Sequence, residues 1–345
     1  MIPHSRPTVA EEDAQAVARV VREGRLAQGP EVAAFETEVA ARVGVAAGAA
    51  VSSGTVALEL ALRALDVGPG AEVIVPTYAC DALHHAVTRC GATPVLADAD
   101  PVTLTLSVVD SKRRLGARTR AIVVPHAFGL AADLEPFEAL GVPIVEDCAQ
   151  ALGARVGTRA AGALGRLAVC SFYATKLLAT GEGGMVLGPQ DLVARVRDLR
   201  EYDERVDLVP RSNAKLTDLQ AALGRSQLRR FDDFIARRRV IAAAYRRRLA
   251  GVPCRAPAEA GTRHVYHRFV IALDVPLDPL IDTMRALGVT ARRPVFRPLH
   301  RALGLDGYPE AERLWTTCLS LPCYPSLTDD EVDAVAQALG RALSR

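Results

Sequence analysis

The stretch Ser171-Phe-Tyr-Ala-Thr-Lys-Leu-Leu-Ala-Thr-Gly-Glu-Gly-Gly184 joins an apolar run typical of a strand to a glycine-rich turn. Lys176 in this stretch is one of three lysines in the chain, where lysine and arginine together number 42. Arginine keeps its charge at neutral pH and cannot provide a free amine, so a rare lysine here favours covalent chemistry. Lys176 is therefore the expected Schiff-base lysine, and the alternative is a solvated charge in a loop.

A second strand-like run, Val142-Pro-Ile-Val-Glu-Asp-Cys-Ala-Gln150, ends with a carboxylate at Asp147. Ligand groups in open α/β sheets lie at the C-terminal ends of the strands. We therefore expect the acid of Asp147 and the amine of Lys176 at one edge of a sheet. The alternative for Asp147 is the capping of a turn.

Apolar runs alternate with helical patterns along the first part of the chain. Strands are expected at residues 49–52, 72–75, 93–97, 121–124, 143–146, 167–172 and 184–187, and helices at 31–42, 55–65 and 81–89. An earlier helix is expected to begin at a capping box of Thr8 and Glu11 and to end at Gly24. Strands that are apolar at every position are covered on both faces, which predicts an α/β fold with a mostly parallel central sheet between helices.

The last third of the chain has a different pattern. An arginine-rich helical stretch at 218–249 is expected to bridge two bodies. A strand at 266–273 and helices at 279–287 and 329–343 follow it. Because 345 residues exceed what one core usually serves, we expect a large domain of residues 1–235 and a smaller C-terminal α+β domain of residues 236–345.

The composition favours small-molecule partners. A formal charge of +2 argues against nucleic acid, and the arginine runs 237–239 and 246–248 are expected to form a solvated helix face. No apolar run reaches the roughly 18 residues of a membrane span, and no signal core is present, so a cytoplasmic protein without a membrane partner is expected. The seven cysteines lack paired C-x-x-C spacing, and no metal site is expected.

The residues named so far meet the needs of pyridoxal phosphate (PLP). This cofactor requires an amine for its aldehyde, an acid at its ring nitrogen, a surface beneath the ring and donors around its phosphate. Lys176 would supply the amine and move a proton on the substrate carbon, and Asp147 would keep the ring nitrogen protonated. The amides of Gly54 and Thr55, at a strand-to-helix junction, would bind the phosphate together with Ser171.

Two further residues are candidates for contacts with the cofactor ring. Tyr78 follows a predicted strand and would lay its ring against the pyridine face; a core tyrosine is the alternative. Gln150, three residues after Asp147, would bond the ring hydroxyl or fix its own loop.

Taken together, these segments resemble the DegT/DnrJ family of fold-type I aminotransferases over nearly the whole chain. The matching motifs are Gln28-Gly-Pro30, Ser53-Gly-Thr55, Pro76-Thr-Tyr78, Glu146-Asp-Cys-Ala-Gln150, Ser171-Phe-Tyr-Ala-Thr-Lys176, Gly181-Glu-Gly-Gly184, Thr217-Asp-Leu-Gln-Ala221 and Leu321-Pro-Cys-Tyr-Pro325. The best-known members transaminate keto-sugars bound to nucleotides. The resemblance implies the PLP-binding fold of these enzymes.

The resemblance also implies roles for individual residues. Lys176 would carry the cofactor, and Asp147 would pair with its ring nitrogen. The remaining contacts implied are Tyr78 and Gln150 at the ring, and Gly54, Thr55 and Ser171 at the phosphate. Asn213 matches an asparagine that family members contribute from the neighbouring subunit, so the resemblance implies a homodimer with shared active sites.

The departures from the family pattern lie near the expected substrate. Lys215 stands where members often carry arginine, and Thr77-Tyr-Ala-Cys-Asp81 differs from the usual aromatic-rich stretch. The segment between Glu201 and Asn213 is short. His126 and His300 resemble family histidines, and each is either a structural donor or a substrate contact.

These observations favour a PLP-dependent aminotransferase of sugar or specialised-metabolite biosynthesis. It would take the amino group from a donor amino acid, glutamate or glutamine, and pass it to a keto-sugar or related ketone. One alternative keeps the cofactor but catalyses elimination, racemisation or carbon–carbon bond chemistry. Another is a regulatory protein that retains the fold without catalysis.

Overall fold

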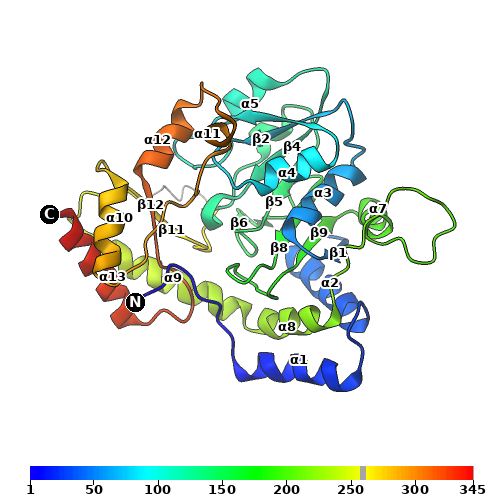
Figure 1. Cartoon of the computed structure of the whole chain (residues 1–345), viewed down its shortest axis with the longest axis horizontal. Helices are drawn as coiled ribbons and strands as arrows, with labels where there is room; N and C mark the ends of the chain where they lie inside the picture. Colours follow the sequence, from blue (N-terminus) through cyan, green and yellow to red (C-terminus); the bar gives the residue numbers. More distant parts are fainter. Residues whose placement is uncertain (257–261, 345) are drawn as a thin grey trace.

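A seven-stranded sheet forms the centre of the larger body (Figure 1), in the order β1-β9-β8-β5-β4-β2-β3. The computed structural model describes residues 1–256 and 262–344. The strands are β1 (Ala47–Val51), β2 (Glu72–Pro76), β3 (Thr93–Ala97), β4 (Thr119–Pro125), β5 (Ile144–Asp147), β8 (Leu167–Ser171) and β9 (Gly184–Gly188). All pairs from β8 to β3 are parallel, while β9 is antiparallel to both its neighbours. The expected α/β fold with a mostly parallel sheet is confirmed.

The apolar strands are covered on both faces, as their composition predicts. In β4, Ala121 and Val123 belong to one buried cluster, and Ile122 and Val124 belong to another. Successive side chains of a strand point to opposite faces, so each face of β4 has its own core. The helices of this body are α1 (Glu11–Glu23), α2 (Pro30–Val43), α3 (Gly54–Ala64), α4 (Ala82–Arg89), α5 (Val108–Arg114), α6 (Glu135–Glu138), α7 (Gln190–Arg200) and α8 (Asp218–Arg229).

The expected capping box at Thr8 is wrong. The first helix begins after Ala10, whose amide donates to the carboxylate of Asp13 at 3.0 Å. Asp13 is buried and pairs with Arg230, which fixes the start of α1 against the end of α8. The helix does end at Gly24, which adopts φ 73 in the left-handed region.

A second, smaller body packs beside the sheet. It contains α10 (Leu277–Ala286), α11 (Leu299–Leu303), α12 (Pro309–Thr317), α13 (Asp329–Leu343) and the antiparallel pair of β11 (Phe269–Ala272) and β12 (Cys318–Leu321). The short strands β6 (Arg155–Val156), β7 (Arg159–Ala160) and β10 (Thr262–Arg263) form a third sheet. Among the described residues, no helix is both long and apolar enough to cross a membrane.

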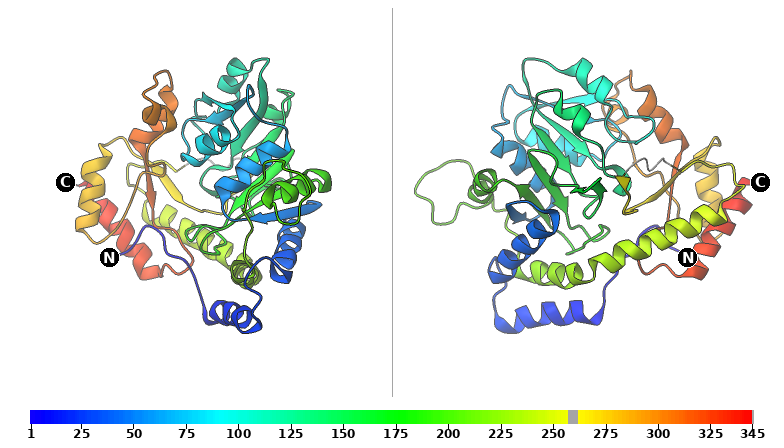
Figure 2. Two further views of the ribbon diagram at one scale, coloured as in Figure 1. Left: turned by 45° about the vertical axis from the view of Figure 1, so that its right-hand side comes forward. Right: turned by 180° about the vertical axis from the view of Figure 1, so that it is seen from behind.

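The two bodies are joined by α8 and α9 (Phe231–Arg248), which run along one side of the molecule (Figure 2). The arginine-rich helical stretch expected at residues 218–249 is therefore two helices, which meet at Arg230. Phe231, Phe234 and Ile235 pack in a core of the larger body, whereas Ile241 and Tyr245 pack in the core of the smaller one. This change of partner supports our proposed boundary between domains 1–235 and 236–345, which falls inside α9.

The expected solvated arginine face on α9 is wrong for Arg238. Its side chain is buried, with 4% exposure, and donates to the carbonyls of Tyr266, His267 and Cys323. These carbonyls lie in loops of the smaller body, so Arg238 ties that body to α9. Arg237 does the same by donating to the carbonyl of Leu327.

Candidate active site

A cavity of about 1010 Å³ lies between the C-terminal edge of the sheet and the smaller body. Four of the predicted site residues line it, namely Tyr78, Asp147, Gln150 and Lys176. The other four, Gly54, Thr55, Ser171 and Asn213, are not among the residues that line it. The expected meeting of Asp147 and Lys176 at one edge of the sheet is therefore what the structure shows.

The turn after β8 presents Lys176 to the cavity. Phe172 bonds Gly183 and Ala174 bonds Gly181 through their backbones, which folds the turn back beside the strand. Gly183 has φ 151, and a Cβ there would lie 2.7 Å from the Thr180 hydroxyl, so the turn requires glycine at this position. The glycine-rich sequence thus explains where the lysine lies.

The environment favours a neutral amine on Lys176. Burial lowers the pKa of this amine, while the neighbouring Cys80 and Asp147 oppose the shift and Arg268 adds to it. No hydrogen bond or ion pair engages the amine among the residues that the structure describes. A lysine with a lowered pKa has a larger neutral fraction, which is the form that attacks a carbonyl carbon.

Asp147 ends β5, and one of its carboxylate oxygens accepts the amide of Ala149 at 2.9 Å. Burial raises the pKa of this carboxyl, and the Ala149 amide, Lys176 and His126 only partly offset it. A cationic ring nitrogen placed beside Asp147 would lower that pKa again. The carboxyl of Asp147 is therefore a suitable partner for the protonated ring nitrogen of PLP.

Ser171 and Gly54 lie against each other at the other end of the expected cofactor site. A Cβ on Gly54 would lie 2.7 Å from the Cβ of Ser171, so only glycine fits this approach without movement. Gly54 opens α3, where Ser53 is the N-cap and accepts the amide of Val56 at 3.2 Å. The first amides of a helix have no partner within it, and the positive helix end attracts anions. This junction fits a phosphate group.

Tyr78 lines the cavity but is held in the core. Its hydroxyl donates to the carbonyl of Leu314 at 3.3 Å, and its ring meets Phe128 edge-on at 6.4 Å. Cys80, two residues later, also lines the cavity and lies near enough to Lys176 to affect its pKa. The sequence departs from the family pattern at Thr77–Asp81, which includes Cys80. This departure alone did not show that Cys80 lies close to Lys176.

Gln150 does fix a loop, since its amide oxygen accepts the backbone amide of Phe128 at 3.0 Å. The amide nitrogen of Gln150 is the group that this bond leaves for a ligand. Gln150 can therefore fix its own loop and bond the ring hydroxyl of PLP at the same time.

His126 is a structural donor and is not a cavity residue. Its Nδ1 accepts the amide of Ala132 at 2.9 Å, and its Nε2 donates to Glu146 at 2.8 Å. Glu146 is fully buried and also accepts the amides of Gly162, Leu164 and Gly165. Burial raises the pKa of Glu146, but His126 and the amides of Gly165 and Gly162 outweigh it and lower the pKa. This pair holds the 162–165 loop against β5.

The same bonds account for a cluster that could otherwise suggest a metal. Ligand atoms of His126, Glu146 and Cys148 lie within 4.8 Å of one another. Because both nitrogens of His126 and both oxygens of Glu146 are already bonded to protein groups, hydrogen bonding explains their proximity.

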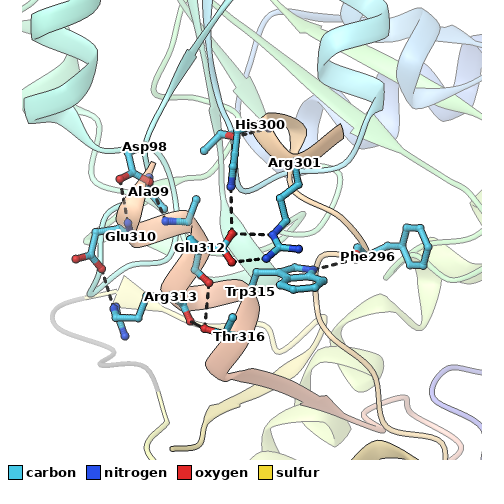
Figure 3. Close-up of polar contacts among 12 residues, drawn as sticks. Asp98, Ala99, Phe296, His300, Arg301, Glu310, Glu312, Arg313, Trp315 and Thr316 are labelled. Atoms are coloured by element: carbon cyan, nitrogen blue, oxygen red, sulfur yellow. Dashed lines mark hydrogen bonds and ion pairs between the residues drawn. The ribbon is translucent and has the colours of Figure 1, made fainter. Parts of the chain in front are cut away.

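His300 also has a structural role, shown in Figure 3. Its backbone amide donates to the Thr77 hydroxyl at 2.9 Å, and its ring bonds that hydroxyl at 2.8 Å and Glu312 at 3.3 Å. Glu312 in α12 also binds Arg301. Asp98, which follows β3, accepts the amides of Glu310 and Ala311 at the start of α12 (Figure 3). These contacts fasten the smaller body to the sheet.

Asn213 is exposed and lies in the loop that follows α7. Its neighbours are anchored to the sheet, because Ala214 bonds Ser52 and Lys215 forms a bridge with Val51. Asn213 is therefore an exposed residue of an anchored loop, and it does not line the cavity of its own chain.

A partly buried lysine and an acid at the carboxyl edge of a mostly parallel sheet define a PLP-dependent enzyme of fold type I. The chain belongs to the DegT/DnrJ/EryC1/StrS aminotransferase family, whose model matches residues 7–340. It is thus a PLP-dependent aminotransferase.

Known proteins of this family resemble the chain over most of its length. GDP-perosamine synthase of Caulobacter vibrioides is 36% identical over 331 residues, which are 90% of this chain and 89% of the relative. UDP-N-acetyl-3-dehydro-alpha-D-glucosamine 3-aminotransferase of Acidithiobacillus ferrooxidans is 34% identical, covering 95% and 92%. The crystal structure of DesV from S. venezuelae, in complex with a ketimine intermediate, is 36% identical with a TM-score of 0.91, covering 96% and 94%.

Proposed function

We propose that this aminotransferase moves an amino group from glutamate or glutamine to a keto-sugar or a related ketone. The observation that carries the proposal is the meeting of Lys176 and Asp147 in one cavity. The relatives support the acceptor class, because two of them are named for aminated sugars linked to GDP or UDP.

The described residues would hold PLP in one orientation. Gly54, Thr55 and Ser171 would bind the phosphate at the start of α3. Asp147 would pair with the ring nitrogen, Gln150 would donate to the ring hydroxyl, and Tyr78 would contact the ring. When bound, PLP supplies an aldehyde for the amine and a ring that withdraws electrons from the substrate carbon.

Lys176 would have two roles. Its amine would hold the cofactor in the resting enzyme, and in the donor half-reaction the same amine, once free, would take the proton from the donor's α-carbon. Burial lowers the pKa of Lys176, which increases the fraction of the amine in the neutral form that accepts a proton. Asp147 would keep its charge beside the ring throughout.

The PLP-loaded protein should convert L-glutamate or L-glutamine to the corresponding keto acid without any acceptor present. The expected yield is one keto acid and one pyridoxamine phosphate per site, measured by chromatography of the released cofactor. D-glutamate serves as the control. A cofactor that stays as PLP while the amino acid is racemised or loses a group would favour the alternative PLP chemistries. No change with any common donor would favour a non-catalytic protein.

We also propose that two copies of the chain share their active sites, with Asn213 of each reaching the cavity of the other. The support is that Asn213 is exposed and does not line the cavity of its own chain. Inactive Lys176→Ala and Asn213→Ala chains, when mixed and refolded together, should regain activity because a mixed dimer has one intact site. Mixtures that stay inactive, although both parents form dimers, would contradict the proposal.

A further inference from the structure

Cys80 presents a thiol to the active-site cavity, and the mechanism above gives this thiol no role. Cys80 is exposed, whereas five of the other cysteines are buried and Cys254 is partly buried. Cys80 lines the cavity together with Lys176 and Asp147. Of the seven cysteines, all of which lie in the described ranges, it is the one that lines this cavity. A ligand of the cavity can therefore touch this thiol.

Backbone hydrogen bonds fix the segment that carries Cys80. The amide of Thr77 donates to the carbonyl of Ala97 at 2.8 Å, and the carbonyl of Thr77 accepts the amide of Leu299 at 2.8 Å. The chain then enters α4, where the carbonyl of Cys80 accepts the amide of Leu83 at 3.4 Å. Cys80 therefore has a defined place between the end of β2 and the start of α4.

The thiol of Cys80 lies close to both Asp147 and Lys176. Although Cys80 opens to the cavity, burial by the surrounding protein raises the pKa of its thiol; the charge of Asp147 adds to this shift, and Lys176 opposes it. The effect is mutual, since among the neighbours of Lys176 it is Cys80 that most strongly opposes the lowering of the lysine pKa. Coulomb interactions weaken with distance, so the sulfur is near both groups.

The proposed orientation of PLP puts the cofactor ring in the same place. The aldehyde carbon, which Lys176 would bind, is attached to the ring atom opposite the nitrogen, which Asp147 would pair with. A protein group that is near both residues is therefore beside the ring. The phosphate would lie farther away, at Gly54 and Ser171, which do not line the cavity with Cys80.

Tyr78 leaves much of the ring surface to another residue. Its side chain is only 4% exposed, because its hydroxyl donates to the carbonyl of Leu314 and its ring packs edge-on against Phe128. The contact of Tyr78 with the cofactor is thus restricted to the small part of its surface that lines the cavity. Cys80, in contrast, is exposed there.

We propose that Cys80 contacts the ring of PLP, an inference that rests on the cofactor orientation proposed above. Sulfur is polarisable and packs favourably against aromatic rings. The thiol must be neutral for this contact, because a thiolate beside the ring would oppose the withdrawal of electrons that the reaction needs. The raised pKa of Cys80 favours the neutral thiol. The departure from the family pattern at Thr77–Asp81 thus has a role in cofactor binding.

The first test measures how fast N-ethylmaleimide alkylates Cys80, by peptide mass spectrometry, in the apoprotein and in the PLP-loaded protein. Borohydride first fixes the cofactor on Lys176. The thiol adds across the double bond of the reagent and its proton passes to the neighbouring carbon, so no further reactant is needed. Cys80 should react in the apoprotein and about tenfold or more slowly once PLP shields the sulfur. Cys254, outside the cavity, is the internal control and should react equally in both forms.

Inorganic phosphate is the control for occupancy of the phosphate site alone. It should leave the alkylation of Cys80 unchanged, because it fills the junction of Gly54 and Ser171 and not the place of the ring.

The second test compares Cys80→Ala with the wild type. The Kd for PLP should rise about threefold to tenfold, because a sulfur–ring contact is lost. The visible absorption band of the bound cofactor should shift. The melting temperature of the apoprotein should change by less than about 2 °C, because Cys80 is exposed in it. Cys254→Ala is the matched control and should keep the wild-type Kd and absorption band.

Four results would overturn the proposal. They are equal alkylation of Cys80 with and without PLP, no alkylation of Cys80 in the apoprotein, protection by phosphate as strong as that by PLP, and an unchanged Kd and absorption band in Cys80→Ala. The last result would mean that PLP blocks entry to the cavity without touching the sulfur. Failure of the proposed orientation looks different, because the reduced cofactor would then be found on a residue other than Lys176. Failure of the proposed aminotransfer would leave the protection of Cys80 intact, while no donor converted PLP.

Discussion

Lys176→Ala is expected to abolish transamination, with the donor half-reaction slowed by more than about 10⁴-fold. The variant loses both the amine that holds the cofactor and the base that takes the donor's proton. Stopped-flow or manual assays of pyridoxamine phosphate formation measure the rate. Borohydride reduction followed by peptide mass spectrometry measures the covalent link, and the added mass expected at residue 176 of the wild type should be missing in the variant.

The chain offers a matched control for this experiment in Lys112, which is an exposed lysine of α5. Lys112→Ala should keep both the rate and the mass addition at Lys176. Adding methylamine to Lys176→Ala should restore part of the rate, because a small amine can enter the cavity and take the proton. A variant that stays fully active, or a wild-type mass addition on another lysine, would refute the assignment.

The sheet could be predicted from the sequence because its strands are apolar at every position. The predicted strand 93–97 has the observed bounds of β3, and helix 329–343 has those of α13, whose capping box of Thr328 and Glu331 is clear in the sequence. A strand that is buried on both faces is apolar at every position, so it can be recognised in the sequence. Lys176 and Asp147 indicated the class of enzyme, because each comes directly after a predicted strand or its turn, and the family motifs taken together made the class specific.

Features set by tertiary contacts could not be predicted in this way. Arg238 resembles its neighbours in sequence, and only the carbonyls of three distant residues make it a buried donor. Thr8 and Glu11 have capping-box spacing, but the contact of Asp13 with Arg230 decides where α1 begins.

Asp147→Asn is expected to slow the donor half-reaction by about 10²–10³-fold, the usual cost of removing one preorganised electrostatic partner. Asparagine keeps the size of the side chain and can still accept the amide of Ala149. It cannot, however, carry the charge that stabilises a protonated ring nitrogen. The rate of pyridoxamine phosphate formation is again the measurement. Asp133→Asn, at an exposed position in the loop after β4, is the control and should keep the wild-type rate.

The pH dependence of cofactor binding separates a charge effect from a loss of structure in Asp147→Asn. Burial raises the pKa of the free carboxyl, so as the pH falls through this raised pKa the wild-type residue gains a proton and loses its charge. The affinity of the wild type for PLP should therefore fall on the acid side, measured by equilibrium dialysis. The asparagine variant has no such group, so that part of its profile should be flat. An asparagine variant with the wild-type acid limb, or with a normal rate, would show that Asp147 does not pair with the cofactor ring.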